Sequence, residues 1–412
     1  MSGLSEKNIV VGVSGGIAAY KAAELTRLLV SAGAKVRVIM TRNAQEFITP
    51  LALQTLSQNP VATETFSLTQ ESEIGHIRLA DTADAIVVAP ATANVIAKAA
   101  TGIADDLLTT VLLAARCPIA FAPAMNVHMY EHPTVGENLA KLRERGATII
   151  EPGSGALACG YEGKGRLADP ATIVEELMRM LSARDLCDER ILVTAGPTQE
   201  PIDPVRFVSN RSTGKMGFAI ARAAWRRGAQ VRLIAGPSGL PTPHGVERID
   251  TVTAGEMLGE TSRNFPWSTT LIMAAAVADF RPRHPAAHKL KKDAKGMMLD
   301  MGPIADELPH LAAKKEDRIM IGFAAETEEL ETNALDKLRR KKLDLIVGND
   351  VSRSDAGFAV DTNIVTMLGA DGHVETTPKL LKDEVGDVIL NRLVSIRTAQ
   401  LAGSTSNSAR RK

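Results

Sequence analysis

One pattern occurs twice in this chain and constrains its fold more than any other feature. The apolar run 9–13 leads into a loop of small residues at 14–16, after which a helix is expected. In the middle of the chain, the apolar run 191–193 leads into the loop 196–198, and a second loop at 209–215 opens another helix. This order is typical of a buried parallel strand in a doubly wound sheet. Two such starts predict two α/β domains in tandem, each with a parallel sheet.

Strands and helices alternate through the rest of both halves. At 412 residues, the chain has room for two or three domains of about 150 residues each. We predict domains at 1–185 and 190–400, a linker over 182–189, and a disordered polar tail at 401–412. The expected elements are strands at 9–13, 36–40, 85–88, 119–122, 148–150, 191–193, 231–234, 271–274, 319–321 and 345–347, helices at 17–32, 171–181, 215–227, 254–264, 328–341 and 379–393, and a hairpin after residue 363.

The composition argues against several classes of function. Lys and Arg together number 48, as do Asp and Glu, so no global positive field favours nucleic acid or acidic membranes. No uncharged apolar run approaches about 18 residues, so we expect no membrane-spanning helix, and the first residues do not resemble a signal peptide. Cys117, Cys159 and Cys187 are far apart and odd in number, which favours the reducing cytoplasm over a disulfide framework or a structural zinc site.

Four loops of the first half follow expected strands, at the sheet edge where doubly wound folds bind their ligands. They lie at 14–16, 41–44, 90–94 and 123–129, and hydroxyl and amide groups recur in them. Backbone amides at a helix N-terminus suit a phosphate group, although glycines in such turns often serve close packing only. No acidic residue follows the second strand to bind a ribose, which argues against NAD and favours a ligand with one phosphate, such as FMN.

Three side chains of the first half could carry chemistry, and each also has a purely structural interpretation. His76 could handle a proton or contact a bound ring, or it could be a surface histidine at a helix start. Asn126 directly follows Pro123-Ala124-Met125, where its amide could hold a carboxylate or bond its own turn. Cys159 lies in the glycine-rich stretch 153–169, which we expect to be an irregular, mobile loop, as a lid or as an ordinary surface loop. Because a thiol packs poorly in such a loop, reactivity explains Cys159 better.

The second half has basic clusters rather than a recognisable nucleotide motif. The run 212–215 invites a P-loop interpretation, which fails because residue 216 is Met where the motif needs Ser or Thr. Basic clusters lie at 288–292 and 339–342, and Asp279 precedes the first of them. Each cluster could be a solvated charge run or could bind a triphosphate, which needs several cations from different elements. Asp279 is then available for a metal ion or a ribose.

The motifs of both halves follow one another in a specific order. The first half contains Gly15-Gly16-Ile17-Ala18-Ala19-Tyr20-Lys21, Gly75-His76-Ile77, Pro90-Ala91-Thr92-Ala93-Asn94, Pro123-Ala124-Met125-Asn126-Val127-His128-Met129 and Ala158-Cys159-Gly160-Tyr161-Glu162-Gly163-Lys164-Gly165-Arg166-Leu167. The second contains Gly196-Pro197-Thr198, Asp203-Pro204-Val205-Arg206, Ser209-Asn210, Lys215-Met216-Gly217, Ala274-Ala275-Ala276-Val277-Ala278-Asp279 and Lys289-Leu290-Lys291-Lys292. The first set resembles the FMN-dependent cysteine decarboxylases, and the second resembles phosphopantothenate–cysteine ligase. In this order, the chain resembles the bacterial bifunctional proteins of coenzyme A biosynthesis, over nearly everything except the tail.

For the second half, the resemblance implies a CTP- and Mg²⁺-dependent ligase that joins 4′-phosphopantothenate to L-cysteine. The carboxylate first takes up CMP with loss of pyrophosphate, and the cysteine amine then attacks the acyl-cytidylate. By motif position, Lys289 contacts the triphosphate, Arg206 and Asn210 contact the substrate and the acyl-cytidylate, and Asp279 also serves the metal. The run 302–306 departs from the family's Asn-Pro-Asp-Ile stretch, which leaves the contacts there and the preference for CTP over ATP open. The implied CTP contacts are Ala274, Ala275, Ala276, Asp279, Lys289, Phe323, Lys337 and Lys341.

For the first half, the resemblance implies an FMN-dependent decarboxylase that converts 4′-phospho-N-pantothenoylcysteine to 4′-phosphopantetheine. Oxidation of the substrate thiol by FMN gives a thioaldehyde, whose C=S bond accepts the electrons that departing carbon dioxide leaves behind. By motif position, Cys159 is the proton donor, Asn126 grips the substrate carboxylate and His76 serves the oxidative half. The implied FMN contacts are Ser14, Gly15, Gly16, Thr41, Pro90, Ala91, Thr92, Asn94 and Met125.

The resemblance also implies an architecture and an assembly. Both domains are Rossmann-like, with a flavoprotein fold over 1–185 and a ligase fold with a late hairpin over 190–400. The protein is a homo-oligomer, perhaps a dodecamer of flavin-domain trimers with paired ligase domains, and FMN lies between neighbouring subunits. Its partners are small molecules, with no nucleic acid and no membrane.

Two other functions remain open on the sequence. A flavin oxidoreductase fused to a nicotinamide-binding domain would also have glycine-rich turns, but it would leave the basic run 288–292 unexplained. A non-catalytic, FMN-binding regulatory protein could share the fold, but such a protein would not need both Cys159 and Asn126. Product formation from CTP, cysteine and phosphopantothenate separates these alternatives from the ligase and decarboxylase.

Overall fold

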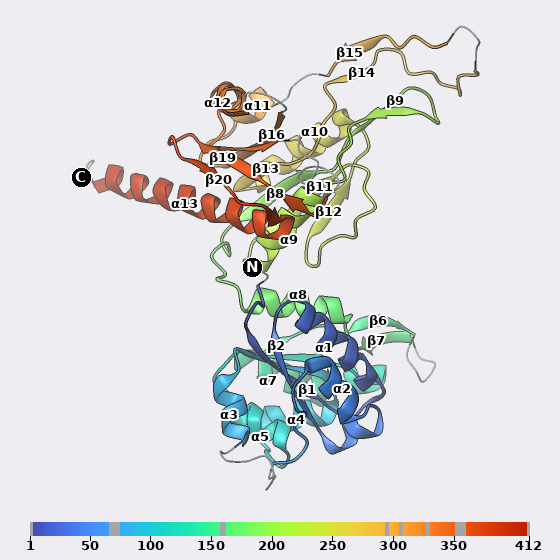
Figure 1. The fold of residues 1–412 in the computed structure, drawn as a ribbon, viewed down its shortest axis with the longest axis vertical. Coiled ribbons are helices and arrows are strands. Elements are labelled where there is room, and N and C mark those ends of the chain that lie inside the picture. Colours follow the sequence, from blue (N-terminus) through green and yellow to red (C-terminus); the bar gives the residue numbers. More distant parts are fainter. Residues whose placement is uncertain are drawn as a thin grey trace. The chain divides into compact units, whose positions relative to one another are not determined.

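The computed structural model describes residues 3–65, 75–156, 162–292, 296–304, 308–326, 330–350 and 360–409. The chain forms two compact units, Met1–Ser182 and Ala183–Lys412. Each unit is built on a parallel or mainly parallel sheet with helices on both faces, which confirms the predicted fold class (Figure 1). Within the described part, no helix combines the length and the apolar character that crossing a membrane requires.

The N-terminal unit is built on a five-stranded, fully parallel sheet in the order β2-β1-β3-β4-β5. β3 is buried along its whole length because both faces of the sheet are covered. The strand order reverses between β1 and β3, and such a switch point opens a crevice at the carboxyl ends of the strands. The strands are β1 (Asn8–Val13), β2 (Lys35–Met40), β3 (Ala85–Ala91), β4 (Ile119–Pro123) and β5 (Thr148–Ile149).

Two hydrophobic cores fill the two faces of this sheet, because alternate residues of each strand point to opposite sides. Val11 of β1 is buried with Leu29 of α1 and Leu177 of α8 on one face. Its neighbour Val10 is buried with Ile96 of α4 on the other face, where α5 and α7 also pack. The helices are α1 (Ala22–Ser31), α2 (Pro50–Ser57), α3 (Gly75–Thr82), α4 (Ala93–Thr101), α5 (Leu107–Ala114), α6 (Val127–Tyr130), α7 (Pro133–Glu144) and α8 (Pro170–Met180), with the 3-10 turns η1 (Ile17–Lys21) and η2 (Arg42–Glu46).

The helix expected over 17–32 has two parts. It begins as the 3-10 turn η1 and becomes α-helical only at Ala22. Gly16 precedes η1 with an extended backbone and no side-chain cap, and the tighter 3-10 turn satisfies an early N–H group, since the N–H of Ala19 donates to Gly16 O at 2.9 Å. The predicted stop at Gly33 is confirmed, since its φ of 85° is the left-handed conformation that favours glycine after a helix.

The stretch 153–169 contains a hairpin rather than the irregular loop expected from its sequence. β6 (Gly153–Ala156) and β7 (Glu162–Arg166) pair in antiparallel fashion. The sequence prediction is wrong here because the glycines suppress the strand pattern while the backbone remains extended. Gly163 and Gly165 have φ angles of 156° and 144°, which residues with a side chain rarely adopt.

The C-terminal unit is built on an eight-stranded sheet in the order β12-β11-β8-β13-β16-β17-β19-β20. The first six strands are parallel, and β19 and β20 form an antiparallel edge that confirms the late hairpin predicted from sequence. The strand order reverses between β8 and β13, which places the second crevice at their carboxyl ends. The strands are β8 (Arg190–Ala195), β11 (Gln230–Ala235), β12 (Glu247–Asp250), β13 (Thr270–Met273), β16 (Ile319–Glu326), β17 (Leu345–Asp350), β19 (Val365–Gly369) and β20 (Val374–Thr376).

Helices cover both faces of this sheet as well. Phe218 of α9 and Ile389 of α13 are buried on one face, and Met257 of α10 and Leu338 of α12 are buried on the other. Two short antiparallel pairs, β9–β10 and β14–β15, extend beyond the sheet as an arm, with β9 beside β14 (Figure 1). The remaining elements are α9 (Lys215–Arg226), α10 (Ala254–Asn264), α11 (Leu308–Ala313), α12 (Leu330–Arg340), α13 (Lys382–Ala409), η3 (Phe265–Trp267), β9 (Gln199–Pro201), β10 (Phe207–Ser209), β14 (Phe280–Pro282), β15 (Met301–Pro303), β18 (Thr362–Asn363) and β21 (Leu380–Leu381).

Residues 183–189 of the segment 182–189, which is expected as a linker, belong to the C-terminal unit. Asp185 forms a two-oxygen ion pair with Arg227, at N–O distances of 2.9 and 2.6 Å. Glu189 is buried and accepts a hydrogen bond from Arg397 of α13. The partners lie 42 and 208 positions away in the chain, so no local pattern distinguishes this charged segment from a solvated linker.

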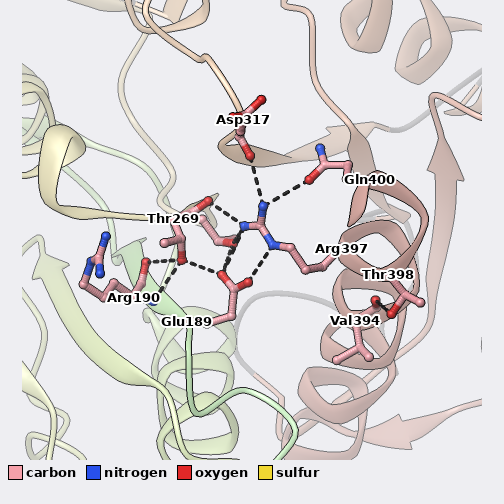
Figure 2. Close-up of polar contacts among 9 residues, drawn as sticks. Glu189, Arg190, Thr269, Asp317, Val394, Arg397, Thr398 and Gln400 are labelled. Carbon is pink, nitrogen blue, oxygen red and sulfur yellow. Dashed lines mark hydrogen bonds and ion pairs between the residues drawn. The ribbon is translucent and has the colours of Figure 1, made fainter. Parts of the chain in front are cut away.

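Figure 2 shows the polar network that joins α13 to the amino ends of β8 and β13. Arg397 Nε donates to Glu189 Oε1 at 2.7 Å, while the hydroxyls of Thr269 and Thr270 donate to Oε2 at 2.5 and 2.8 Å. Arg397 also donates to the carbonyls of Thr269 and Asp317, both at 3.0 Å. Burial raises the pKa of the Glu189 carboxyl, but the hydrogen bonds from Arg397 and the two threonines outweigh it and hold that pKa below its ordinary value.

Helix α13 is longer than the sequence predicts. It begins at Lys382 and continues to Ala409, into the stretch 401–412 that we expected to be a disordered tail. Once a helix has formed, each further residue adds a hydrogen bond, and no proline interrupts this stretch. The polar composition of the stretch therefore does not end the helix where the apolar pattern ends.

Candidate functional sites

A cavity of about 840 Å³ opens at the carboxyl ends of the parallel strands in the N-terminal unit. Its size is within the range of about 300–1,000 Å³ that is usual for cofactor and small-molecule sites. The loops that the sequence singled out meet here, because the carboxyl ends of parallel strands share one edge of the sheet. Of the predicted site residues, those that line the cavity are Ser14, Gly15, Gly16, Thr41, Thr92, Asn94, Met125 and Asn126.

The Ser14 hydroxyl holds two of these loops together. Ser14 Oγ donates to the carbonyl of Pro90 at 2.7 Å and accepts from the backbone N–H of Thr92 at 3.1 Å. Pro90 therefore supports the cavity through Ser14 and does not line it. Ala91, also expected to contact FMN, is fully buried behind the lining residues.

Gly15 and Thr41 give this cavity the features of a built binding site. A methyl group on Gly15 would lie 2.3 Å from Cβ and 2.8 Å from the carbonyl carbon of Asn43, so the first two loops can approach this closely only with glycine there. Thr41 Oγ1 is buried and has no hydrogen-bond partner among the described residues. A buried polar atom without a partner costs free energy, so a ligand that accepts or donates at Thr41 would relieve it. The residues present therefore fit a phosphorylated flavin.

Asn126 lies at the opposite wall of the cavity, on a turn that the β6–β7 hairpin supports. Its Oδ1 caps α6 by accepting from the N–H of His128 at 2.9 Å. The N–H of Met125 donates to the carbonyl of Gly165 at 2.9 Å, and a side chain at Gly165 would meet Met125 O at 2.4 Å. The structural and the functional interpretations of Asn126 are thus compatible, since the residue caps its own turn and also lines the cavity.

An ion-pair cluster that the sequence analysis missed lies beneath the same cavity. Lys98 Nζ is 2.7 Å from a carboxylate oxygen of Asp105 and 3.3 Å from one of Asp106, and Lys98 and Asp106 both line the cavity. These carboxylates, Asp105 first, raise the pKa of Lys98 above its ordinary value. Asp106 also caps α5 by accepting from the N–H of Thr109 at 2.8 Å. The capping box Asp106-x-x-Thr109 was the available sequence signal, but it marks a helix start and not a ligand.

Two predicted catalytic residues are not brought to this cavity by the described chain. His76 is half-buried in the first turn of α3, as expected for a helix start, but it is not among the lining residues. Cys159 lies outside the described residues, between β6 and β7. The segment that contains Cys159 therefore joins the two strands of a hairpin. One of these strands, β7, lines the cavity through Gly165 and Arg166.

A second cavity, of about 700 Å³, opens at the carboxyl ends of β8, β13 and β16 in the C-terminal unit. Its lining combines the loop after β13 with the start of the arm and with side chains of α10 and α12. Sequence reasoning had not singled out Thr194, Met257 or Leu343, because none of them lies in a recognisable motif, and it had named Arg211 only as part of the loop 209–215. The predicted site residues that line the cavity are Asn210, Ala275, Ala276, Asp279, Phe323, Lys337 and Lys341.

The loop after β13 is held in place by a ladder of hydrogen bonds. The N–H of Ala276 donates to Gly196 O at 2.9 Å, and the N–H of Ala278 donates to Thr198 Oγ1 at 3.0 Å. Asn210 Nδ2 donates to the carbonyls of Ala276 and Val277 at 3.1 and 3.2 Å. The Gly-Pro-Thr loop, the Asn210 amide and the alanine-rich loop therefore form one rigid wall of small residues, against which a flat ligand can lie closely.

Cations dominate the electrostatics of this cavity. Lys337 lines it from α12, Lys341 from the turn directly after α12, and Arg211 from the loop before α9, whereas Asp279 is the only carboxylate among the described lining residues. Lys337 Nζ donates to the carbonyl of Phe323 at 3.5 Å, which keeps it near the end of β16. An excess of positive charge from two elements fits a polyphosphate. Among the described residues, no group of three His, Cys, Asp or Glu side chains could hold a metal ion by itself.

Two residues expected at the nucleotide, Ala274 and Lys289, and one expected at the substrate, Arg206, do not line this cavity. Ala274 is partly buried against the core, and its N–H bonds the carbonyl of Thr194. Lys289 and Arg206 lie on the arm, Lys289 exposed and Arg206 with its side chain 39% exposed. By motif order, Lys289 is expected at the triphosphate and Arg206 at the substrate, whereas their positions depend on the arm, which motif order cannot reveal.

The fold and the two cavities define a class of protein: a tandem α/β chain with one cofactor-type site and one cation-lined site, each at the switch point of a doubly wound sheet. Residues 2–182 match the Flavoprotein family model, and residues 186–396 match the model described as the DNA/pantothenate metabolism flavoprotein C-terminal domain. The chain is 49% identical over 397 residues to the coenzyme A biosynthesis bifunctional protein CoaBC of Bacillus subtilis strain 168, covering 95% of this chain and 98% of that one. It is 46% identical to its Escherichia coli K12 counterpart, with the same coverage.

The chain belongs to the family of coenzyme A biosynthesis bifunctional proteins. It is a bifunctional enzyme with a flavoprotein decarboxylase domain and a ligase domain, as the resemblance of its motifs implied. A solved structure of the C-terminal domain of a CoaBC protein is 39% identical and covers 52% of this chain and 98% of its own, with a TM-score of 0.45.

Proposed function

We propose that the enzyme makes 4′-phosphopantetheine in two steps, one in each unit. The C-terminal unit joins 4′-phosphopantothenate to L-cysteine at the expense of CTP, through an acyl-cytidylate. The N-terminal unit decarboxylates the resulting 4′-phospho-N-pantothenoylcysteine with FMN. The observation that carries the proposal is the pair of cavities at the two switch points. The first is lined by glycine and hydroxyl loops and has a buried hydroxyl without a partner among the described residues, and the second is lined by an alanine-rich loop with three cations and one carboxylate.

The ligase step needs stabilisation of negative charge on the nucleotide phosphates. Lys337, Lys341 and Arg211 supply fixed positive charge in the cavity. Lys289 lies on the arm outside the cavity lining and is proposed to contact the triphosphate from there. Asp279 is the proposed protein ligand of Mg²⁺. One carboxylate suffices, because Mg²⁺ usually keeps several waters and is held largely by the phosphates of the nucleotide.

Substrate positioning in the ligase falls to the amide wall and the arm. Asn210, fixed by the carbonyls of Ala276 and Val277, is proposed to contact phosphopantothenate and the acyl-cytidylate, together with Arg206. Ala275 and Ala276 have small side chains, which leave room for the planar base and the ribose of the nucleotide. This arrangement converts the attack of the cysteine amine into a step between oriented groups.

The decarboxylase step is supported by the Flavoprotein match and by the loops that line the first cavity. Ser14, Gly15, Thr41 and Thr92 are proposed to hold the phosphate and the ring edge of FMN, whose chemistry when bound is reversible oxidation of the substrate thiol. Asn126 is proposed to hold the substrate carboxylate. Cys159 and His76 are proposed to handle protons, Cys159 from the segment that joins β6 to β7. Decarboxylation converts a charged carboxylate into neutral carbon dioxide, so it is favoured where neighbouring groups do not stabilise the negative charge. A neutral amide can hold the carboxylate without stabilising its charge strongly.

The assembly is proposed to be a homo-oligomer in which neighbouring flavin units complete each other's sites. Ile17 and Tyr20, at the mouth of the flavin cavity, are 62% and 57% exposed, and Met129 beside Asn126 is 49% exposed. Exposed large apolar side chains that cluster around a cavity are typical of interaction surfaces. Such an interface offers a route by which His76 reaches a cavity that it does not line within its own chain.

Nucleotide dependence tests the ligase half. The purified enzyme with 4′-phosphopantothenate and Mg²⁺ should release pyrophosphate from CTP, and addition of L-cysteine should convert the intermediate to 4′-phospho-N-pantothenoylcysteine, detected by mass spectrometry. If ATP released pyrophosphate at the same rate as CTP, the proposed preference for CTP would be wrong. No pyrophosphate from either nucleotide would refute the ligase chemistry altogether.

A further inference from the structure

The basic segment Lys289–Lys292 is attached to the rest of the arm at defined points. The arm begins at the rim of the nucleotide cavity, where the N–H of Ile304 bonds the carbonyl of Asp279 at 2.9 Å and both residues line the cavity. β14 and β15 then pair, and the chain between them, residues 283–300, contains the basic segment. The location of these lysines therefore depends on what holds this excursion.

A turn at 202–206 holds the excursion through three hydrogen bonds. The N–H of Ala286 donates to Ile202 O at 2.9 Å, and the N–H of Leu290 donates to Asp203 Oδ2 at 3.1 Å. The Arg206 side chain donates to the carbonyl of Leu290. Leu290 directly follows Lys289, so both polar backbone groups of this residue are engaged next to the lysine.

The Asp203 carboxylate is the centre of this junction. Its side chain is fully buried, and Oδ1 accepts from the N–H groups of Val205 and Arg206 at 2.8 and 2.9 Å. Oδ2 accepts from the N–H of Leu290 and lies 3.5 Å from Arg206 Nε. Although burial raises the pKa of the Asp203 carboxyl, the backbone donors lower it by more, so the group is ionised at neutral pH. A buried carboxylate whose two oxygens are both hydrogen-bonded holds the groups around it in fixed positions.

The same turn also leads directly to the substrate side of the cavity. After Arg206, β10 runs from Phe207 to Ser209, and the next residue, Asn210, lines the cavity and bonds the alanine-rich loop. Asp203 thus connects the segment that carries Lys289 with the strand that ends at Asn210. A shift at this junction would change the distance between Lys289 and the Asn210 amide, which the proposed function assigns to the same reaction.

We propose that Asp203 is a positioning residue for the ligase reaction, which holds the segment Lys289–Lys292 in register with Asn210 through the Leu290 N–H. The inference rests on the proposed function, because Lys289 is assigned to the triphosphate there. The competing role for Asp203 is stabilisation of its own turn, through Val205 and Arg206. The two roles use different oxygens of the carboxylate, so they can be separated.

Asp203→Asn separates them chemically. The remaining carbonyl oxygen of the amide can still accept from Val205 and Arg206, whereas the NH₂ group faces the N–H of Leu290 as a second donor. The turn is retained and the contact with Leu290 is lost. Leu290→Pro is a second, independent variant: it deletes the N–H from which Asp203 Oδ2 accepts, and it also fixes the backbone φ angle of residue 290. Leu290 is 36% exposed, so its side chain contributes little to the core. Asp300→Asn is the matched control, since Asp300 is on the same excursion but makes an exposed pair with Arg283.

The full-length variants are compared in two assays. The first is limited proteolysis by trypsin, with peptide mapping of cleavage after Lys291 and Lys292, because trypsin does not cleave the Lys–Pro bond that Leu290→Pro creates after Lys289. Asp203→Asn and Leu290→Pro should accelerate cleavage there about tenfold or more, because release from a stable contact raises the population of open states. The second is pyrophosphate release from CTP, for which kcat should fall about 10- to 100-fold, the usual effect of misplacing a catalytic group by about an ångström. The KM for L-cysteine, which enters after this step, should stay within about twofold.

Each outcome decides between the two roles. Wild-type cleavage and wild-type kcat in Leu290→Pro would overturn the positioning role, as would a lost ligase activity with an unchanged cleavage pattern. Asp300→Asn should match the wild type in both assays. If the wild type itself releases no pyrophosphate, the proposed function fails, while the proteolysis assay still reports whether Asp203 holds the segment.

Discussion

At the residue scale, Thr41 gives the most specific prediction about the flavin cavity. Its buried hydroxyl has no partner among the described residues, so Thr41→Val should leave the stability of the flavin-free protein unchanged or slightly raised. The same change should weaken FMN binding about 2- to 12-fold, the equivalent of one hydrogen bond of about 0.5–1.5 kcal/mol. Flavin fluorescence titration and calorimetry of the flavin-free protein measure the two effects. Unchanged FMN affinity would show that Thr41 does not face the cofactor.

A matched threonine provides the control for that experiment. Thr109 Oγ1 is fully bonded within its capping box, at 2.8 Å from Asp106 Oδ1. Thr109→Val should therefore destabilise the flavin-free protein by about 1 kcal/mol, the usual value of a capping interaction. The contrast between the two threonines separates loss of a ligand contact from loss of a structural contact.

Lys382 gives the C-terminal unit a distinctive response to pH. Burial, and then the charge of Lys215, lower the pKa of Lys382 to about 8. Since the unfolded chain holds this proton up to about pH 10.4, it binds more protons than the folded state between pH 8 and 10, and the Lys382 contribution to the free energy of unfolding rises with pH. Lys382→Met removes the titration, so its stability relative to the wild type should be highest at pH 7 and decline toward pH 10. Urea unfolding at both pH values measures this, with Lys379→Met as the exposed control.

The Lys382 prediction would be contradicted by a stability difference between Lys382→Met and the wild type that does not vary with pH. It would also be contradicted by a difference that grows toward pH 10, because this has the opposite sign. The hydrogen bond from Lys382 Nζ to the carbonyl of Val360 is lost in the variant at every pH and affects only the constant part of the difference.

Sequence reasoning found the polar loop residues that line the flavin cavity, but it missed the charged residues that pair across neighbouring helices. Thr41, Thr92 and Asn126 were found because each follows a recognisable strand, and strand ends converge on one sheet edge. Lys98 and Asp106 were missed because they lie in a helix and a helix cap, where charged residues are ordinary. Only the fold reveals that both contribute to the cavity.

At the element scale, the Glu189–Arg397 pair anchors α13 to the amino ends of two central strands. Arg397→Met should destabilise the C-terminal unit by about 3–5 kcal/mol, because it leaves a buried carboxylate without its cation. The control is Arg263→Met, whose ion pair with Glu260 lies on the surface and should cost no more than about 0.5 kcal/mol. Denaturant unfolding followed by the two tryptophans, both in this unit, measures the difference. Equal effects of the two variants would contradict the anchoring role.

The elements themselves were predicted where periodicity is strong and missed where glycine or distant partners decide. The central strands and α10 were recovered from apolar runs and helical spacing. The β6–β7 hairpin was not, because Gly163 and Gly165 adopt backbone angles that no side-chain pattern marks. The segment 182–189 was taken for a linker because the partners that fix it, Arg227 and Arg397, are far away in the chain.

At the scale of the whole molecule, two doubly wound units each place one cavity at a switch point of the sheet, and the two cavities differ in the loops that line them. The repeated strand–loop–helix start was sufficient to predict this architecture, because parallel sheets bring all strand ends to one edge. It was not sufficient to predict the arm, whose short antiparallel strands carry Lys289 and Arg206 away from the cavity. The proposed division of labour follows from the linings: cations beside an alanine-rich loop for a polyphosphate in one unit, and glycine and hydroxyl loops for a phosphorylated flavin in the other.

The most direct test of this account follows the carboxyl carbon of cysteine through both reactions. The enzyme is given FMN, Mg²⁺, 4′-phosphopantothenate and L-cysteine labelled with ¹³C in its carboxyl group, and labelled carbon dioxide is measured together with pyrophosphate. The account predicts that labelled carbon dioxide appears only when CTP is added and approaches one equivalent per pyrophosphate. Labelled carbon dioxide in the absence of any nucleotide, or pyrophosphate without labelled carbon dioxide at completion, would contradict it.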